Sequence, residues 1–174
     1  VRALREGQLA WEEDPAGQVL LDLRARMLAA SSEEWILRFA RDVEDYLLRG
    51  TLRGAEHWTR GSVPRLDDYE RQRGFDSAVY SSQDLIELCG GMPIQDSLFE
   101  DADFRRLREL CTRVVAFVND LVSYTKEVRR HHSPNNLLHV FMNEYSISLD
   151  EAITEAVALI NRDVAEFETI AARC

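Results

Sequence analysis

The chain has 174 residues, 45% of them hydrophobic, which is enough apolar material for a single domain with a sizeable core. Its 21 basic against 31 acidic residues give a net charge of -10, which argues against nucleic acid as a partner because a nucleic-acid-binding face needs a basic stripe. Three cysteines without a CxxC pair argue against a disulfide framework or a zinc site, and the lack of a long apolar run argues against a membrane span, so we expect a cytoplasmic protein.

The apolar period is helical almost throughout, and no segment alternates as a half-buried strand does. Capping serines and aspartates, prolines and glycines divide the helical pattern into segments. Gly50 does not end the second helix, whereas Gly74 is expected to weaken the short third one. The expected helices are 15–28, 33–58, 66–73, a run that follows 76–77 and reaches 89, then 104–130, 137–145 and 149–172. We therefore predict an all-α, single-domain bundle.

Three oxygen-bearing side chains recur every fourth residue on the helix expected over 104–130. Asn119, Ser123 and Glu127 lie at i, i+4 and i+8, so they form a ladder on one helical face. An amide oxygen, a hydroxyl and a carboxylate make a hard ligand set that suits Mg²⁺ sharing its other positions with phosphates. A merely solvated polar face is the alternative. The ladder predicts a magnesium-diphosphate site.

The run Asn119-Asp-Leu-Val-Ser123-Tyr-Thr-Lys-Glu127 is followed by Asn135-Asn-Leu-Leu-His-Val and by a Ser-Leu-Asp-Glu-Ala helix start. This arrangement resembles bacterial class I terpene synthases (sesquiterpene cyclase-like terpene cyclases), whose second metal motif is (N/D)xxSxxxE. The resemblance extends over essentially the entire chain. It implies the class I terpene synthase helical bundle, with Asn119, Ser123 and Glu127 as metal ligands.

The resemblance also implies residues that act on the substrate. An arginine that senses diphosphate precedes the first metal ligand by 46 residues in the family, and Arg73 stands at that position. The family's linker aspartate and its effector, which presents a backbone carbonyl to the substrate, correspond to Asp76 and Ser77. Lys126 matches a lysine that often contacts diphosphate. Arg73, Asp76 and Ser77 are thus the expected catalytic residues, and Arg73 and Lys126 the expected diphosphate-binding residues.

Two family motifs have no counterpart in residues 1–174. The aspartate-rich first metal motif would fall before Val1, and the Arg-Tyr pair would fall beyond Cys174. Asp67 with Asp68 begins the charged helix of Arg73, and the acidic cluster 100–103 is typical of a helix cap, so neither is a substitute. We expect residues 1–174 to be one helical terpene synthase domain, an interior to C-terminal part of a longer chain.

The implied function is Mg²⁺-dependent ionisation and cyclisation of a linear prenyl diphosphate, with Mn²⁺ as a second candidate metal and farnesyl diphosphate as the first candidate substrate. Geranyl or geranylgeranyl diphosphate, giving mono- or diterpenes, stays open. A truncated, non-catalytic diphosphate-binding module, a prenyl chain-elongating transferase and an acidic helical adaptor are the rival classes. Dimers are common in the family that the chain resembles, so a homodimer is a candidate assembly and the oligomeric state stays open.

An apolar, aromatic pocket would protect a carbocation from water. Aromatic residues near the expected helix break or on neighbouring helices are candidates for it, with ordinary core packing as the alternative. These candidates are Phe39, Tyr46, Trp58, Phe75 and Tyr80.

Overall fold

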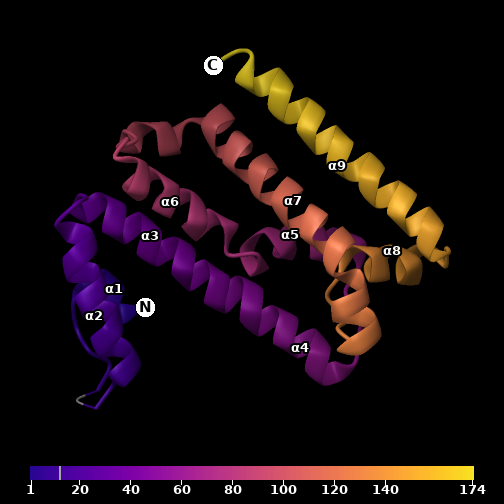
Figure 1. The fold of residues 1–174 in the computed structure, drawn as a ribbon, viewed down its shortest axis with the longest axis horizontal. Coiled ribbons are helices and arrows are strands. Elements are labelled where there is room, and N and C mark those ends of the chain that lie inside the picture. The colour runs from indigo at the N-terminus through magenta and orange to yellow at the C-terminus, as the bar shows by residue number, and fades with distance from the viewer. Residues whose placement is uncertain (12) are drawn as a thin grey trace.

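The computed structural model describes residues 1–11 and 13–174, and all regular structure in these ranges is helical (Figure 1). The elements are α1 (Arg2–Glu6), α2 (Pro15–Leu28), α3 (Glu33–Asp45), the π-helical segment η1 (Tyr46–Thr51), α4 (Leu52–Arg60), α5 (Leu66–Asp76), α6 (Val79–Gly90), the 3₁₀ segment η2 (Asp96–Glu100), α7 (Ala102–Tyr124), the π-helical segment η3 (Thr125–Arg130), α8 (Leu137–Tyr145) and α9 (Leu149–Ala171). The all-α prediction is confirmed. Within the same ranges, no helix is both long and apolar enough to cross a membrane.

Side-chain caps start several helices where the sequence predicts a start. The Asp14 carboxylate accepts from Gly17 N at 2.8 Å at the beginning of α2, and Ser32 Oγ accepts from Trp35 N at 3.2 Å at the beginning of α3. Asp101 caps α7 by accepting from Phe104 N at 2.8 Å, and Ser148 opens α9 with a complete capping box. Each cap satisfies backbone donors that a helix leaves without a partner in its first turn.

A long rod runs from α3 through η1 into α4, as predicted for a helix that passes Gly50 (Figure 1). Gly50 lies in η1 and is buried against the end of α5. A Cβ on Gly50 would come within 2.7 Å of the Asp76 backbone N and Cα. The missing side chain therefore lets η1 touch the backbone at the point where α5 ends.

Replacing Gly50 with alanine is expected to destabilise the protein. Alanine normally stabilises a helix interior by about 0.5–1 kcal/mol relative to glycine. Here the backbone must shift to admit the methyl group, and overpacking of this kind costs about 1–3 kcal/mol. Gly90→Ala is the control, because a Cβ there meets only the flexible end of Met92 at 3.2 Å. Denaturant unfolding of both variants checks this, and a Gly50→Ala protein as stable as the wild type would contradict the packing argument.

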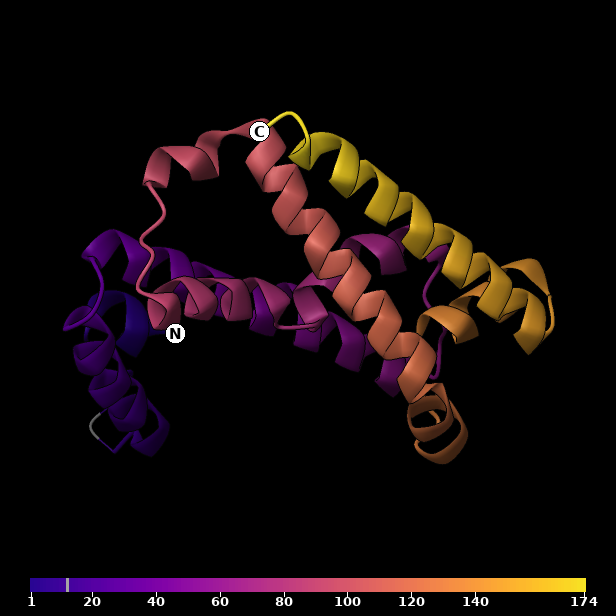
Figure 2. The same ribbon diagram turned by 45° about the horizontal axis from the view of Figure 1, so that its top comes forward.

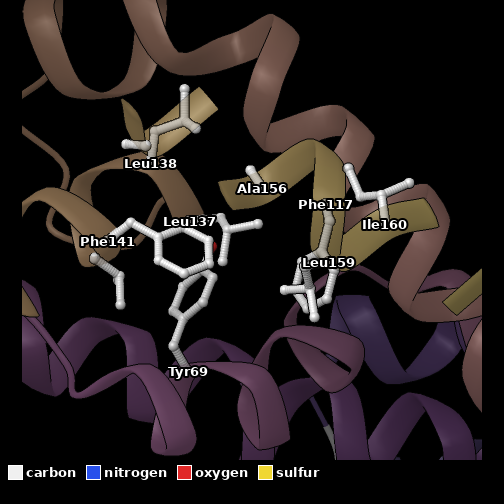
Figure 3. Close-up of a cluster of buried hydrophobic side chains, with 10 residues drawn as sticks. Tyr69, Phe117, Leu137, Leu138, Phe141, Ala156, Leu159 and Ile160 are labelled. Atoms are coloured by element: carbon white, nitrogen blue, oxygen red, sulfur yellow. The ribbon is translucent and has the colours of Figure 1, made fainter. Parts of the chain in front are cut away.

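Two apolar clusters hold the helices together. One joins α1, α2 and α3 around Leu4, Trp35 and Ile36. The other joins α5, α7, α8 and α9, and Figure 3 draws it around Tyr69, Leu137 and neighbouring side chains. Helices α7 and α9 lie side by side in both ribbon views (Figures 1 and 2). The second cluster fixes α5, α7 and α8 relative to one another, and these are the helices that carry the oxygen ladder and Arg73.

A buried ionic network ties α3, α6 and α7 together. Asp84 is 2% exposed and accepts from Arg108 Nη2 at 3.0 Å and from Arg38 Nε at 3.4 Å. Arg108 also donates to Asp42 at 3.0 Å. Burial and the neighbouring Asp42 carboxylate outweigh the two arginines and raise the pKa of Asp84 to about 7. The folded protein therefore holds a proton here that an unfolded chain releases.

The raised pKa of Asp84 predicts a stability that falls as the pH rises from about 4 to about 7. In this window the unfolded chain has lost the proton and the folded chain has not, so the free energy of unfolding drops by up to about 1.4 kcal/mol per pH unit from this group. Asp84→Asn cannot titrate, so its stability relative to the wild type should rise between pH 5 and pH 8. Urea titrations of both proteins across this range measure the difference, and a constant or falling difference would refute the assignment.

Candidate functional site

Five of the seven predicted site residues, Arg73, Asp76, Ser77, Asn119 and Glu127, line a cavity of about 510 Å³ between the end of α5, α7, η3 and the segment before α8, whereas Ser123 and Lys126 do not. A larger cavity of about 660 Å³ is lined by surface charges of both signs and contains no part of the oxygen ladder, so the smaller one is the candidate site. The lining of the candidate cavity consists of Arg73, Asp76, Ser77, Val79, Val115, Ala116, Asn119, Glu127, Ser133 and Asn135.

Arg73 reaches from α5 to α7 at the edge of this cavity. Its Nε donates to Asp120 Oδ1 at 2.9 Å, its Nη2 lies 2.7 Å from the same oxygen, and Nη2 also donates to Asn119 Oδ1 at 3.1 Å. Burial alone would lower the pKa of Arg73, but the charge of the Asp120 carboxylate and its hydrogen bond to Arg73 outweigh it and raise that pKa. A permanently charged guanidinium therefore borders the cavity, with its side chain 11% exposed.

Asp120 is fully buried and fixes Arg73 through a set of shared contacts. Its Oδ2 accepts from Tyr69 Oη at 2.6 Å and from Leu137 N at 3.1 Å, while its Oδ1 faces Arg73. Figure 3 shows Tyr69 rising from α5 toward Leu137 and Phe141 of α8. Burial raises the pKa of Tyr69 well above its ordinary value, so the phenol keeps its proton and can donate. One carboxylate thus joins α5, α7 and the start of α8.

Two of the three predicted metal ligands line the cavity, and the third lies between them in the sequence. Asn119 and Glu127 line the cavity, and Glu127 accepts from Asn136 Nδ2 at 3.2 Å. Ser123, between them, has a buried Oγ without a hydrogen-bond partner among the described residues. An orphaned hydroxyl is costly unless a ligand satisfies it, and one amide, one hydroxyl and one carboxylate oxygen match a hard divalent cation. The residues present fit the metal that the sequence predicts.

The break between α5 and α6 forms the next wall of the cavity. Asp76 is the last residue of α5, and Ser77 follows it with its Oγ donating to Gly74 O at 2.7 Å. Ala78 then adopts a left-handed φ of 57°, a conformation that costs a non-glycine residue energy. Burial raises the pKa of Asp76, and the carboxylates of Asp120 and Glu127 act in the same direction. The structure places the predicted linker and effector positions at this break, beside Arg73.

Other predicted residues lie away from the cavity. Lys126 is exposed on η3 and is absent from the cavity lining. None of the five aromatic candidates lines it either: Phe39 stacks on Trp35 in the N-terminal core, and Trp58 is 53% exposed. The side chains that give this cavity its apolar area are instead Val79, Val115 and Ala116.

Sequence reasoning missed the residues that support the site. The sequence marks Asp120 only by its position next to Asn119. The one available signal was Tyr69, which stands one helical turn before Arg73, because a buried tyrosine needs a hydrogen-bond partner. Asn136 belongs to the motif after the oxygen ladder, and nothing in the sequence marks it as a support, yet its Nδ2 donates to Asp120 O at 2.9 Å and to Glu127. Asn135 lines the cavity and donates to Gly54 O at 3.0 Å, and its Oδ1 is buried without a partner in the described part of the chain.

Known proteins share both the sequence pattern and the fold. The family model described as "Terpene synthase family 2, C-terminal metal binding" matches residues 2–166. A (+)-T-muurolol synthase ((2E,6E)-farnesyl diphosphate cyclizing) from Roseiflexus castenholzii is 32% identical over 85% of this chain and 45% of its own length. Germacrene A synthase from Nostoc punctiforme is 30% identical over 92% of this chain and 49% of its own. The chain therefore spans about half the length of these relatives.

A solved structure agrees in fold. The crystal structure of a-eudesmol synthase superposes with a TM-score of 0.85 at 20% identity, covering 98% of this chain and 55% of that protein. The resemblance and the helical bundle predicted from the sequence are thereby confirmed. The family model spans nearly the whole chain and is a metal-binding one, which agrees with the oxygen ladder on α7 and η3. The chain belongs to terpene synthase family 2 and carries its C-terminal metal-binding region.

Proposed function

We propose that this chain belongs to a class I terpene cyclase, in which it binds Mg²⁺ and the diphosphate of a linear prenyl diphosphate and takes part in its ionisation and cyclisation. The observation that carries this proposal is the convergence of Arg73, Asn119 and Glu127 on one cavity. Ser123, between the two ligands in sequence, adds a buried hydroxyl without a partner among the described residues. Farnesyl diphosphate is the first candidate substrate, since the name of the Roseiflexus relative includes it.

Asn119, Ser123 and Glu127 would hold the metal, which when bound supplies positive charge that stabilises a departing diphosphate. Arg73 is the permanent cation at the same cavity and donates charge-assisted hydrogen bonds to phosphate oxygens. Such donors matter because negative charge builds up on the leaving group as the carbon-oxygen bond breaks. Lys126 would need to turn inward to take part, so its role stays a prediction.

Two further features suit an ionising substrate. Val79, Val115 and Ala116 give one side of the cavity an apolar surface, which keeps water from a carbocation. Asp76 and Ser77 lie at the break between α5 and α6, where peptide carbonyls are not all committed to helical hydrogen bonds. We propose that the Ser77 carbonyl faces the reacting carbon and that Asp76 couples Arg73 to this break.

The test is to incubate the purified protein and Mg²⁺ separately with geranyl, farnesyl and geranylgeranyl diphosphate. Gas chromatography reads volatile products, and a coupled assay reads diphosphate release. We expect a cyclic C15 product that disappears with a chelator. A cyclic product from another chain length would correct only the substrate. Tight diphosphate binding without product would favour the non-catalytic module. The absence of both binding and product would overturn the proposed function.

A further inference from the structure

One oxygen of the site, Asn119 Oδ1, has two competing partners, Arg73 and the proposed metal ion. Asn119 Oδ1 is the first proposed metal ligand, yet in the structure it accepts a hydrogen bond from Arg73 Nη2 at 3.1 Å. A guanidinium and a divalent cation on the same amide oxygen repel each other at short range. The side chain of Arg73 is only 11% exposed, so solvent screens this repulsion weakly. Metal binding at Asn119 therefore requires Arg73 to withdraw from that oxygen.

A second contact keeps Arg73 from leaving altogether. Asp120 Oδ1 holds both Nε and Nη2, at 2.9 and 2.7 Å. Asp120 itself cannot turn away, because Tyr69 Oη and Leu137 N hold its other oxygen at 2.6 and 3.1 Å. If Nη2 gives up Asn119 Oδ1 and turns toward the cavity, it also loosens its own contact with Asp120, and Nε is then the donor that keeps Arg73 on Asp120.

We propose that Asp120, supported by Tyr69, is a positioning residue that lets Arg73 exchange Asn119 for a phosphate oxygen when metal binds. The inference rests on the proposed function and adds a coupling to it. In the structure Arg73 donates to Asn119 Oδ1, the proposed metal ligand, and this contact lowers the affinity of the site for metal. With metal bound, Arg73 would then turn Nη2 away from Asn119 toward the cavity, where it could donate to a phosphate oxygen. Metal and diphosphate therefore bind with positive cooperativity, and Arg73 carries the coupling.

The affinity for Mn²⁺ without substrate distinguishes this coupling from a simple diphosphate-binding role of Arg73. Only the coupling predicts that the loss of Arg73 tightens Mn²⁺ binding. Arg73→Met removes the competitor on Asn119, so Mn²⁺ alone should bind more tightly, by about fivefold or more. Inorganic diphosphate added to the Mn²⁺-loaded variant should bind more weakly than to the loaded wild type. Isothermal titration calorimetry or the spin resonance of free Mn²⁺ measures both. Unchanged or weaker binding of Mn²⁺ alone by Arg73→Met would overturn the inference.

Tyr69 tests the positioning step, because it touches Asp120 and not the cavity. Tyr69→Phe removes one hydrogen bond to Asp120 and should weaken diphosphate binding to the Mn²⁺-loaded protein by about fivefold. In an Arg73→Met background the same change should have no further effect, since there is no guanidinium left to position. An equal loss of diphosphate affinity in both backgrounds would show that Tyr69 acts independently of Arg73, and would overturn its positioning role.

A neighbouring ion pair provides the matched control. Arg113 on α7 donates to Asp163 of α9 at 2.7 Å, and Asp163 is 5% exposed, so this pair resembles Arg73 with Asp120 in burial but lies outside the cavity lining. Asp163→Asn should lower the unfolding temperature and leave Mn²⁺ and diphosphate affinities unchanged. If the wild type binds neither ligand, the proposed function fails. If it binds both but Arg73→Met does not tighten Mn²⁺ binding, only the coupling fails.

Discussion

Arg73→Met is expected to lower kcat/KM for metal-dependent diphosphate release by roughly 10²–10³-fold. Removing one preorganised donor to a developing anion typically costs about 2.7–4 kcal/mol of transition-state stabilisation, and Arg73 borders the cavity with its charge held permanently. Methionine keeps the length and apolar bulk of the stem, so packing against α7 is largely preserved. Steady-state kinetics with a prenyl diphosphate and saturating Mg²⁺ measure the loss.

Arg71→Met is the matched control for this result. Arg71 lies two residues earlier on the same helix, is exposed, and pairs with Asp67 and Asp68 on the surface. It is absent from the lining of the candidate cavity. Its loss should leave kcat/KM unchanged and alter stability by less than about 1 kcal/mol. Equal losses in both variants would mean that the Arg73 effect is not specific to the site.

Glu127→Gln is expected to raise the Mg²⁺ concentration needed for half-maximal activity by at least about 10- to 100-fold. Glutamine preserves the size of the side chain and leaves an amide oxygen, but it removes the one negative charge among the three proposed ligands. Loss of a residue that merely supports a metal ligand already costs about this much. Activity against Mg²⁺ concentration and direct Mn²⁺ titration should shift together.

Glu155→Gln serves as the control for Glu127. Glu155 is exposed on α9 and lies outside the cavity lining, so its charge can affect the site only at long range. The Mg²⁺ concentration that Glu155→Gln needs for half-maximal activity should match that of the wild type. A Glu127→Gln protein with the wild-type Mg²⁺ dependence would remove Glu127 from the ligand set and leave the ladder without its anionic member.

Most of the helical framework is predictable from the sequence because local signals agree with the tertiary packing. Asp14, Ser32 and Ser148 cap helices where the apolar period begins, and Gly61 ends α4 in a left-handed conformation. The prediction that this helix ends at Arg73, before Gly74, is wrong, because α5 continues through Gly74 to Asp76. The reason is tertiary: Gly74 is buried with Thr112 and Tyr80 close by, and this packing outweighs the low helix propensity of glycine. Such neighbours are invisible to a helical-period argument.

The candidate site is predictable only in part, for a similar reason. Helical spacing puts Asn119, Ser123 and Glu127 on one face, and family spacing points to Arg73. Nothing local predicts that η3 would be π-helical or that Lys126 would face outward. The supporting role of Asp120 is not predictable from the sequence, because its partners Arg73 and Tyr69 lie on α5, which is distant in sequence. Contacts between helices set the supporting residues, whereas spacing within one helix sets the ligands.

Metal and diphosphate should meet at the cavity between α5, α7 and η3. A crystal structure of the protein grown with Mg²⁺ and inorganic diphosphate tests it most directly. We predict a metal ion at about 2.0–2.1 Å from Asn119 Oδ1, Ser123 Oγ and a Glu127 carboxylate oxygen. Arg73 should then donate to a phosphate oxygen and keep its contact with Asp120. Metal and diphosphate bound elsewhere, with Arg73 still on Asn119, would contradict the account.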